Sequence, residues 1–93
     1  MTHQYLLAHD LGTTGNKATL FDVDRGVVKV STSEPYPTFY PQPGWAEQDP
    51  ADWQRVIWQC THRLISQAGI EPGAIAAVSF SGHMQGALLV DRQ

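Results

Sequence analysis

The sequence predicts an α/β fold, a mixed β-sheet with one helix in the order β-β-β-α-β-β. Three short apolar segments separated by glycine-containing turns come first, one long segment with helical periodicity follows, and two short apolar segments come last. The chain has 93 residues, of which 42% are hydrophobic and 16% are charged. This composition favours one small globular domain and excludes both a disordered chain and a large two-domain enzyme.

The first three strands are expected at residues 5–9, 17–21 and 27–31. The first segment is a short apolar run without a 3.6-residue period, and the second alternates between apolar and polar residues. The turns at residues 10–15 and 22–26 contain glycine, and Gly26 can adopt the positive φ that a tight turn requires. Two hairpins in succession predict an antiparallel meander.

The helix is expected at residues 50–68. Asp49 can cap its first turn, Pro50 suits the first helical position, and Gly69 follows its end. Apolar residues recur at helical spacing and predict one core-facing stripe. The stripe contains Trp53, Val56, Ile57, Cys60 and Leu64.

The remaining segments are a loop and two strands. Four prolines between residues 34 and 44 interrupt any strand pairing, so this stretch is expected to be an extended surface loop. Residues 74–80 and 87–90 are short apolar runs, each bounded by glycine, and are expected to be strands.

Charge and cysteine content restrict the partners and the compartment. The formal net charge is −3 and the basic residues are scattered, so we expect no nucleic-acid partner. The single cysteine, Cys60, cannot form an internal disulfide, and the first residues do not resemble a secretory signal, which favours the cytoplasm. No apolar run approaches the roughly 18 to 20 residues of a membrane helix, so no membrane partner is expected.

Residues 10–17 read Asp-Leu-Gly-Thr-Thr-Gly-Asn-Lys and carry groups suited to phosphoryl transfer. Backbone N–H groups and the hydroxyls of Thr13 and Thr14 can converge on phosphate oxygens, and Lys17 can offset their charge. Asp10, at the end of a strand, can hold hydrated Mg²⁺, which prefers oxygen ligands and retains much of its water.

The spacing alone leaves another interpretation open. The order of residues is neither that of a Walker motif nor that of the three-glycine dinucleotide fingerprint. The segment could be a hairpin turn in which Gly12 and Gly15 only supply backbone freedom.

Three segments together carry a resemblance to a known family. Residues 10–14 resemble the first phosphate motif of the superfamily of sugar kinases, actin and heat-shock chaperones, which share a ribonuclease H-like fold. Residues 44–50 with Trp53, and residues 79–86 followed by 89–91, narrow the choice. In this order, the three segments resemble the amino-terminal part of FGGY-family carbohydrate kinases. Within that family, they are most similar to xylulokinase-like members. An actin-like or chaperone-like ATPase would account for the first segment only.

The resemblance implies a ribonuclease H-like fold and the use of ATP and Mg²⁺. Asp10 would be the catalytic acid that positions magnesium, through water, and the transferring phosphate. Gly12, Thr13, Thr14 and Lys17 would bind the phosphates of ATP.

The resemblance also implies a sugar site at His83, Met84 and Gln85. Xylulokinases carry Met-His near this position, with side chains that line the sugar pocket, whereas here His precedes Met and Gln follows it. Gln85 is a neutral donor and acceptor and cannot carry the charge of a histidine. Glycerol kinases place an Arg-Glu pair here, which this sequence lacks, so glycerol is disfavoured. The alternative is that these residues only form a turn.

Other residues are expected to be structural. In the segment 44–49, Trp45 can cover the core and Asp49 can cap the helix, so no catalytic role is expected there. Cys60 is expected to be buried and inert. The histidines have no Cys or His partners at metal-ligand spacing, so no zinc site is expected.

The family's general base and its adenine-binding second domain would lie beyond Gln93. Residues 1–93 are therefore expected to be a partial N-terminal domain of a kinase that phosphorylates a ketose or polyol, most of all a pentulose, and to be inactive alone. The apolar pair Trp58 and Ile65 lies beside the main helix stripe and needs a neighbour, so a homo-oligomer is expected. The alternative is a non-catalytic module that binds sugar or phosphate, or only self-associates.

Overall fold

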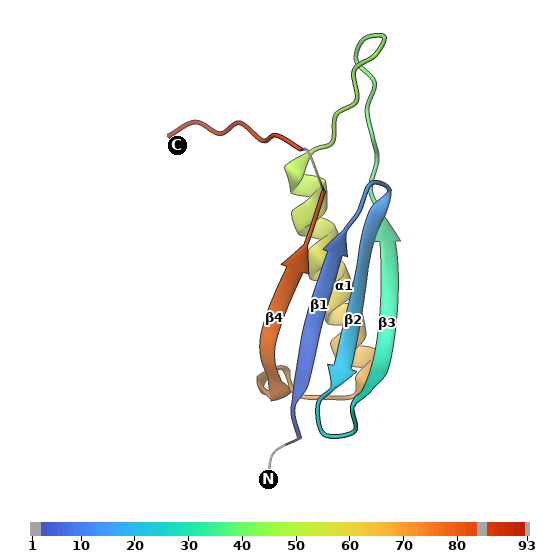
Figure 1. Ribbon diagram of the computed structural model, residues 1–93, viewed down its shortest axis with the longest axis vertical. Coiled ribbons are helices and arrows are strands. Elements are labelled where there is room, and N and C mark those ends of the chain that lie inside the picture. The colour runs from blue at the N-terminus through green and yellow to red at the C-terminus, as the bar shows by residue number, and fades with distance from the viewer. Residues whose placement is uncertain (1–2, 84–85, 93) are drawn as a thin grey trace.

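Figure 1 shows a four-stranded mixed sheet with one long helix behind it. The computed structural model describes residues 3–83 and 86–92. The elements are β1 (Tyr5–Leu11), β2 (Gly15–Asp22), β3 (Val27–Pro35), α1 (Pro50–Ala68), the 3₁₀ turn η1 (Pro72–Ala74) and β4 (Ile75–Ser81).

The strand order is β3-β2-β1-β4. The pairs β1–β2 and β2–β3 are antiparallel, which confirms the predicted meander, and β4 pairs with β1 in parallel. A parallel pair requires a crossover connection, and α1 lies in the connection between β3 and β4. The carboxyl ends of β1 and β4 therefore lie at the same edge of the sheet. The segments that follow these two strands, residues 12–14 and 82–86, contain most of the predicted site residues.

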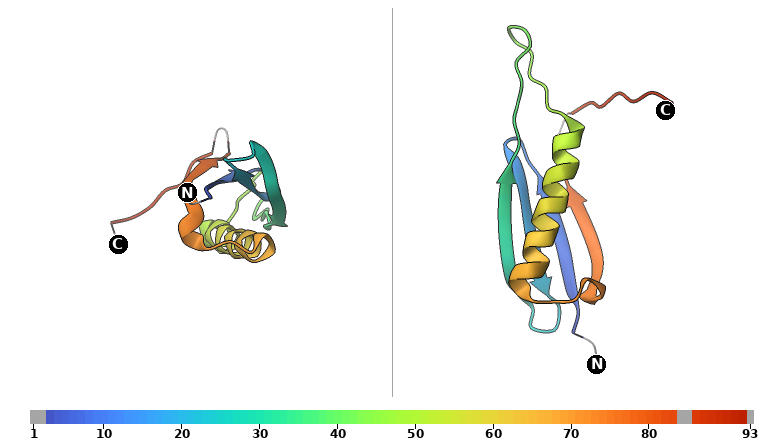
Figure 2. Two further views of the ribbon diagram at one scale, coloured as in Figure 1. Left: turned by 90° about the horizontal axis from the view of Figure 1, so that it is seen from below. Right: turned by 180° about the vertical axis from the view of Figure 1, so that it is seen from behind.

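The core lies between α1 and one face of the sheet, and within the part of the chain that the structure describes the other face carries no helix (Figure 2). Alternate strand residues point toward α1 and are buried, because side chains alternate between the two faces of a strand. Val56, Cys60 and Leu64 of the helix are fully buried against them, whereas Ile57 is only partly buried. The strand residues of the core are Tyr5, Leu7, Ala18 and Leu20.

Both ends of α1 are as the sequence predicts. The Asp49 carboxylate accepts a hydrogen bond from the Ala51 N–H at 2.9 Å, and Pro50 occupies the first helical position. Gly69 ends the helix with a φ of 65°, in the left-handed region that favours glycine.

The structure corrects three predictions about strands. Residues 87–90 form no strand, and Leu89 is 94% exposed, because a strand exists only through ladder hydrogen bonds and this segment runs away from the sheet (Figure 1). Asp10 belongs to β1 rather than to the following turn. The strand β3 extends to Pro35, which tolerates this position because it is the last residue of an edge strand.

Trp45 is 52% exposed, so the expectation that it covers the core is wrong. Within the described residues, no helix is long and apolar enough to cross a membrane.

Candidate functional site

The turn between β1 and β2, residues 12–14, is here named the phosphate turn. The Gly12 N–H closes it by donating to the carbonyl oxygens of Asp10, at 3.1 Å, and Gly15, at 2.9 Å. Neither glycine has a positive φ. A Cβ atom on Gly15 would lie 2.6 Å from the Glu34 carbonyl oxygen. Gly15 is therefore required for the close approach of β3 and not for backbone freedom.

All three carbonyl oxygens of the phosphate turn accept hydrogen bonds from one neighbouring segment, residues 36–48. The Tyr36 hydroxyl donates to the Gly12 oxygen, and the Tyr36 N–H donates to the Thr14 oxygen at 3.2 Å. The Gln48 side-chain amide donates to the Thr13 oxygen at 2.8 Å. The acceptors of the turn are thus all satisfied within the protein.

The hydrogen-bond donors of Thr13 and Thr14 in the same turn are, by contrast, not satisfied within the protein. Across residues 3–83 and 86–92, the N–H groups and hydroxyls of Thr13 and Thr14 form no hydrogen bond, and both residues are exposed. A set of unpaired N–H and O–H donors on a tight turn is suited to phosphate oxygens. The N–H of Gly12 is already used in closing the turn.

Asp10 and Lys17 lie opposite each other on β1 and β2, and Ser81 is the partner of Asp10 on β4. The Ser81 hydroxyl donates to the Asp10 carboxylate at 3.1 Å. These three residues line one cavity of about 290 Å³. Lys17 forms no ion pair with any described residue, so its charge is available to an anion.

A larger cavity of about 620 Å³ lies beside the phosphate turn. Thr13, Gln48, Trp53 and His83 supply polar groups and aromatic rings to its lining, as in many small-molecule sites. The His83 ring lies 5.6 Å from the Trp53 ring and 6.5 Å from the Tyr36 ring, measured between centroids.

The predicted site residues thus fall into two groups joined by the phosphate turn. Asp10 and Lys17 line the smaller cavity, and Thr13 and His83 line the larger one. Gly12 and Thr14 line neither, and Met84 and Gln85 lie outside the described residues.

Two residues that contact the phosphate turn, Tyr36 and Gln48, were not predicted from the sequence. Gln48 lies in the segment 44–50, which resembles a motif of the FGGY family. That segment was interpreted as structural because Asp49 can cap the helix. Tyr36 lies among prolines that indicated only a loop. No spacing in the sequence showed that either residue reaches the phosphate turn.

A buried polar chain lies behind the turn, under α1. The Asn16 side-chain amide lies 3.0 Å from His9 Nδ1, and His9 Nε2 lies 3.2 Å from the Thr61 hydroxyl. Burial lowers the pKa of His9 below its ordinary value of 6.5 and so favours the neutral ring. His9 therefore joins the sheet to the helix and brings no charge to the site.

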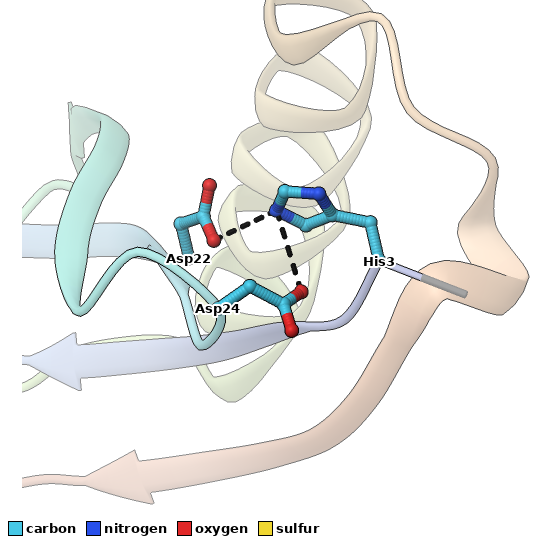
Figure 3. A group of neighbouring side chains, drawn as sticks. All are labelled: His3, Asp22 and Asp24. Atoms are coloured by element: carbon cyan, nitrogen blue, oxygen red, sulfur yellow. Dashed lines mark hydrogen bonds and ion pairs between the residues drawn. The ribbon is translucent and has the colours of Figure 1, made fainter. Parts of the chain in front are cut away.

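The opposite end of the sheet holds the group of possible metal ligands shown in Figure 3. His3 Nε2 lies 2.7 Å from an Asp22 oxygen and 3.5 Å from an Asp24 oxygen. The same oxygens also accept hydrogen bonds from the N–H groups of Arg25 and Gln4, each at 3.0 Å. These contacts account for the cluster without a metal ion.

Comparison with known proteins places this architecture. Residues 5–93 match the model of the FGGY family of carbohydrate kinases, N-terminal domain. A glycerol kinase of Acaryochloris marina is 42% identical over 89 residues, which cover 95% of this chain and 17% of that protein. A glycerol kinase of Limosilactobacillus reuteri is 37% identical over 93 residues, which cover 96% of this chain and 18% of that protein.

Solved structures agree with the sequence matches. The structure of a xyloylose kinase from Brucella ovis matches with a TM-score of 0.87 and 35% identity, covering 96% of this chain and 18% of that chain. A ligand-bound xylulose kinase from Lactobacillus acidophilus matches with a TM-score of 0.77 and 33% identity, and the match covers 87% of this chain and 16% of that chain.

The chain spans less than a fifth of the length of these relatives. The family model nevertheless matches almost all of it, in the N-terminal domain. The chain belongs to the FGGY family of carbohydrate kinases.

Proposed function

We propose that these residues form the part of a carbohydrate kinase that binds the sugar and the phosphates of ATP. The whole protein would transfer the γ-phosphate of ATP to a hydroxyl of a ketose or polyol, with a pentulose as the first candidate. One observation carries the proposal: Thr13 and Thr14, whose N–H and O–H donors are unpaired, lie in the chain between Asp10 and Lys17, which line one cavity, and Thr13 itself lines a larger cavity with His83.

The phosphate end of the site acts through charge and hydrogen bonding. Thr13 and Thr14 donate to phosphate oxygens, and Lys17 offsets the negative charge that they carry. The exposed Asp10 carboxylate offers one oxygen ligand, which fits a Mg²⁺ ion held largely through water. The ion would neutralise charge on the transferring phosphate. Asp10 in turn is oriented by the Ser81 hydroxyl.

The sugar end of the site is the larger cavity. His83 lines it, and Met84 and Gln85 follow His83 directly in the chain. The Arg-Glu pair that glycerol kinases carry at this position is absent, which supports a pentulose rather than glycerol. The relatives carry the names of both glycerol kinases and xylulose kinases, so both substrate classes belong in the test.

Thermal-shift screening of the complete kinase against pentuloses, hexuloses and polyols tests the substrate class. The substitution Gln85→Ala then tests the sugar site. If the Gln85 amide holds a sugar hydroxyl, the loss should weaken sugar binding by about 1 to 3 kcal/mol, the usual cost of an unpaired buried polar group, with ATP binding unchanged. Unaltered sugar binding in isothermal titration would remove Gln85 from the site.

The adenine site and the general base would lie in the remainder of the protein, and residues 1–93 would be a partial N-terminal domain without kinase activity of their own. In the isolated chain, Trp58, Val78 and Phe80 are each more than half exposed. This apolar surface favours pairing with a second copy. Sedimentation equilibrium at micromolar concentration should show a dimer or larger species, and a monomer would contradict the proposal.

The alternative function is a non-catalytic module that binds sugar or phosphate or only self-associates. The same exposed apolar surface supports its self-associating form, so self-association alone does not distinguish the two functions. A kinase and a module differ in sugar-dependent release of ADP, which only the kinase produces.

A further inference from the structure

The hydrogen bonds to the phosphate turn determine where its N–H groups point. In a trans peptide, the carbonyl of one residue and the N–H of the next point in opposite directions. The Gly12 carbonyl accepts from the Tyr36 hydroxyl, so the N–H of Thr13 points away from Tyr36. The Thr13 carbonyl accepts from Gln48, so the N–H of Thr14 points away from Gln48.

Gln48 is itself held in one orientation. Its amide nitrogen donates to the Thr13 carbonyl at 2.8 Å and to the Thr38 hydroxyl at 2.9 Å. Its amide oxygen accepts from the Trp53 indole N–H at 2.9 Å. A flipped amide would place its oxygen against the Thr13 carbonyl and its nitrogen against the Trp53 indole N–H, so these two contacts specify the same orientation. The Thr38 hydroxyl can donate or accept and is compatible with it.

Tyr36 combines two separable roles. The residue is 5% exposed and belongs to the hydrophobic core, a role that a phenylalanine could also fill. The hydroxyl adds the contact to the Gly12 carbonyl, and core packing does not require it. Removal of the hydroxyl alone therefore tests the turn and spares the core.

We propose that Gln48 and Tyr36 are positioning residues of the phosphate turn, each orienting the phosphate-binding N–H of one threonine. Tyr36 acts on Thr13, and Gln48 acts on Thr14. The inference rests on the proposed function because it takes phosphate as the ligand of these N–H groups. Gln48 and Thr13 also line the larger cavity, so the same contact joins the cavity wall to the phosphate turn.

The test follows the backbone amide signals of a ¹⁵N-labelled chain during titration with inorganic tripolyphosphate, a probe that needs no adenine site. Three variants are compared with the wild type: Gln48→Met, Tyr36→Phe and the control Gln54→Met. Gln54 is an exposed residue of α1, and among the described residues its side chain forms no hydrogen bond with the phosphate turn.

The wild-type chain should bind the probe, with shifts at Thr13 and Thr14. Loss of one orienting hydrogen bond should weaken binding by about tenfold in Gln48→Met and by severalfold in Tyr36→Phe, with no change in Gln54→Met. Without the probe, the Thr14 signal should move most in Gln48→Met and the Thr13 signal most in Tyr36→Phe, while signals of α1 stay in place.

Wild-type affinity in both turn variants would overturn the inference and leave phosphate binding intact. A loss of affinity accompanied by shifts throughout α1 would also overturn it, because the role would then be structural. If Gln48→Met does not fold, Tyr36→Phe decides the question, because it retains the buried ring. A wild-type chain that does not respond to tripolyphosphate would refute the proposed phosphate site itself, and the positioning role would fall with it.

Discussion

The two turns at opposite ends of β2 use their polar groups in opposite ways. In the phosphate turn, the carbonyl oxygens are bonded within the protein, and the N–H groups of Thr13 and Thr14 are left over. In the hairpin turn at residues 23–26, the Asp22 carboxylate accepts the Arg25 N–H at 3.0 Å, and the Asp22 carbonyl accepts the Gly26 N–H at 2.9 Å.

The two turns therefore differ in the groups that they leave unpaired. Both turns contain glycine and both join antiparallel strands. In the hairpin turn, Asp22, the last residue of β2, accepts the N–H groups of Arg25 and Gly26, and the Gln4 carbonyl accepts the N–H of Val23. In the phosphate turn, the carbonyl oxygens are instead bonded from outside by the segment 36–48, which leaves the N–H donors of Thr13 and Thr14 unpaired, as the proposed phosphate site requires.

The largest expected effect separates Asp10, which lies in β1 two residues before the phosphate turn, from Asp24 in the hairpin turn. In the complete kinase, Asp10→Asn should lower kcat by about 10² to 10³-fold with little change in KM for the sugar, because the lost charge acts on magnesium and phosphate. Asp24→Asn, in the hairpin turn, should leave both constants unchanged. Steady-state kinetics with saturating ATP measure both variants, and near-normal turnover of Asp10→Asn would remove this residue from the mechanism.

The next effect concerns the glycines. Gly15→Ala should lower the free energy of unfolding by about 2 to 3 kcal/mol, because its Cβ would meet the backbone of Glu34. Gly26→Ala should cost only about 1 kcal/mol, since its φ of 67° disfavours a side chain but the space around it is open. Urea unfolding of the chain compares the two, and an equal cost would contradict the close approach of β2 and β3.

The hairpin end should also lose stability in acid. Burial opposes ionisation of Asp22, but the Arg25 N–H and His3 outweigh it and hold the pKa of Asp22 below its ordinary value of 3.8. Ionised Asp22 therefore stabilises the fold above pH 3.8, and this contribution disappears as the pH falls through the lower folded pKa. Asp22→Asn should be less stable than the wild type at pH 7, with the difference shrinking below pH 3.8. A difference that does not depend on pH would refute the role of the charge.

The smallest effect arises behind the phosphate turn and in a different pH range. Burial keeps the pKa of His9 below 6.5, so the unfolded chain binds the proton more readily and stability falls as the pH drops below 6.5. His9→Gln should lose less stability than the wild type between pH 7.5 and 5.5, and the exposed control His62→Gln should behave like the wild type. Equal losses in all three proteins would contradict a buried neutral His9.

Local sequence signals predicted the parts of the fold that depend on local chemistry. The ends of α1 follow from Asp49, Pro50 and Gly69, whose capping and backbone preferences act within one turn of the helix. The apolar run at residues 87–90 also predicted a strand from local sequence, and this prediction was wrong. Strand pairing depends on a neighbouring strand, which the local sequence does not specify.

The candidate site could be predicted from the sequence only in part, for the same reason. Asp10, Thr13 and Thr14 lie in one short segment and could be found together. Tyr36 and Gln48 are 24 and 35 residues from the carbonyls they contact, so only the folded chain brings them to the turn. The close approach of the Glu34 backbone in β3 to Gly15 is likewise a contact between residues far apart in the sequence.

A coupled ADP-release assay tests the central claim most directly. It compares the 93-residue chain with the polypeptide in which this segment continues to the length of its kinase relatives, each with MgATP and a panel of pentuloses, hexuloses, glycerol and other polyols. The account predicts sugar-dependent ADP release by the longer polypeptide, fastest with a pentulose, and none by the 93 residues alone. A longer polypeptide that releases no ADP with any sugar or polyol, or that releases ADP equally fast without one, would contradict it.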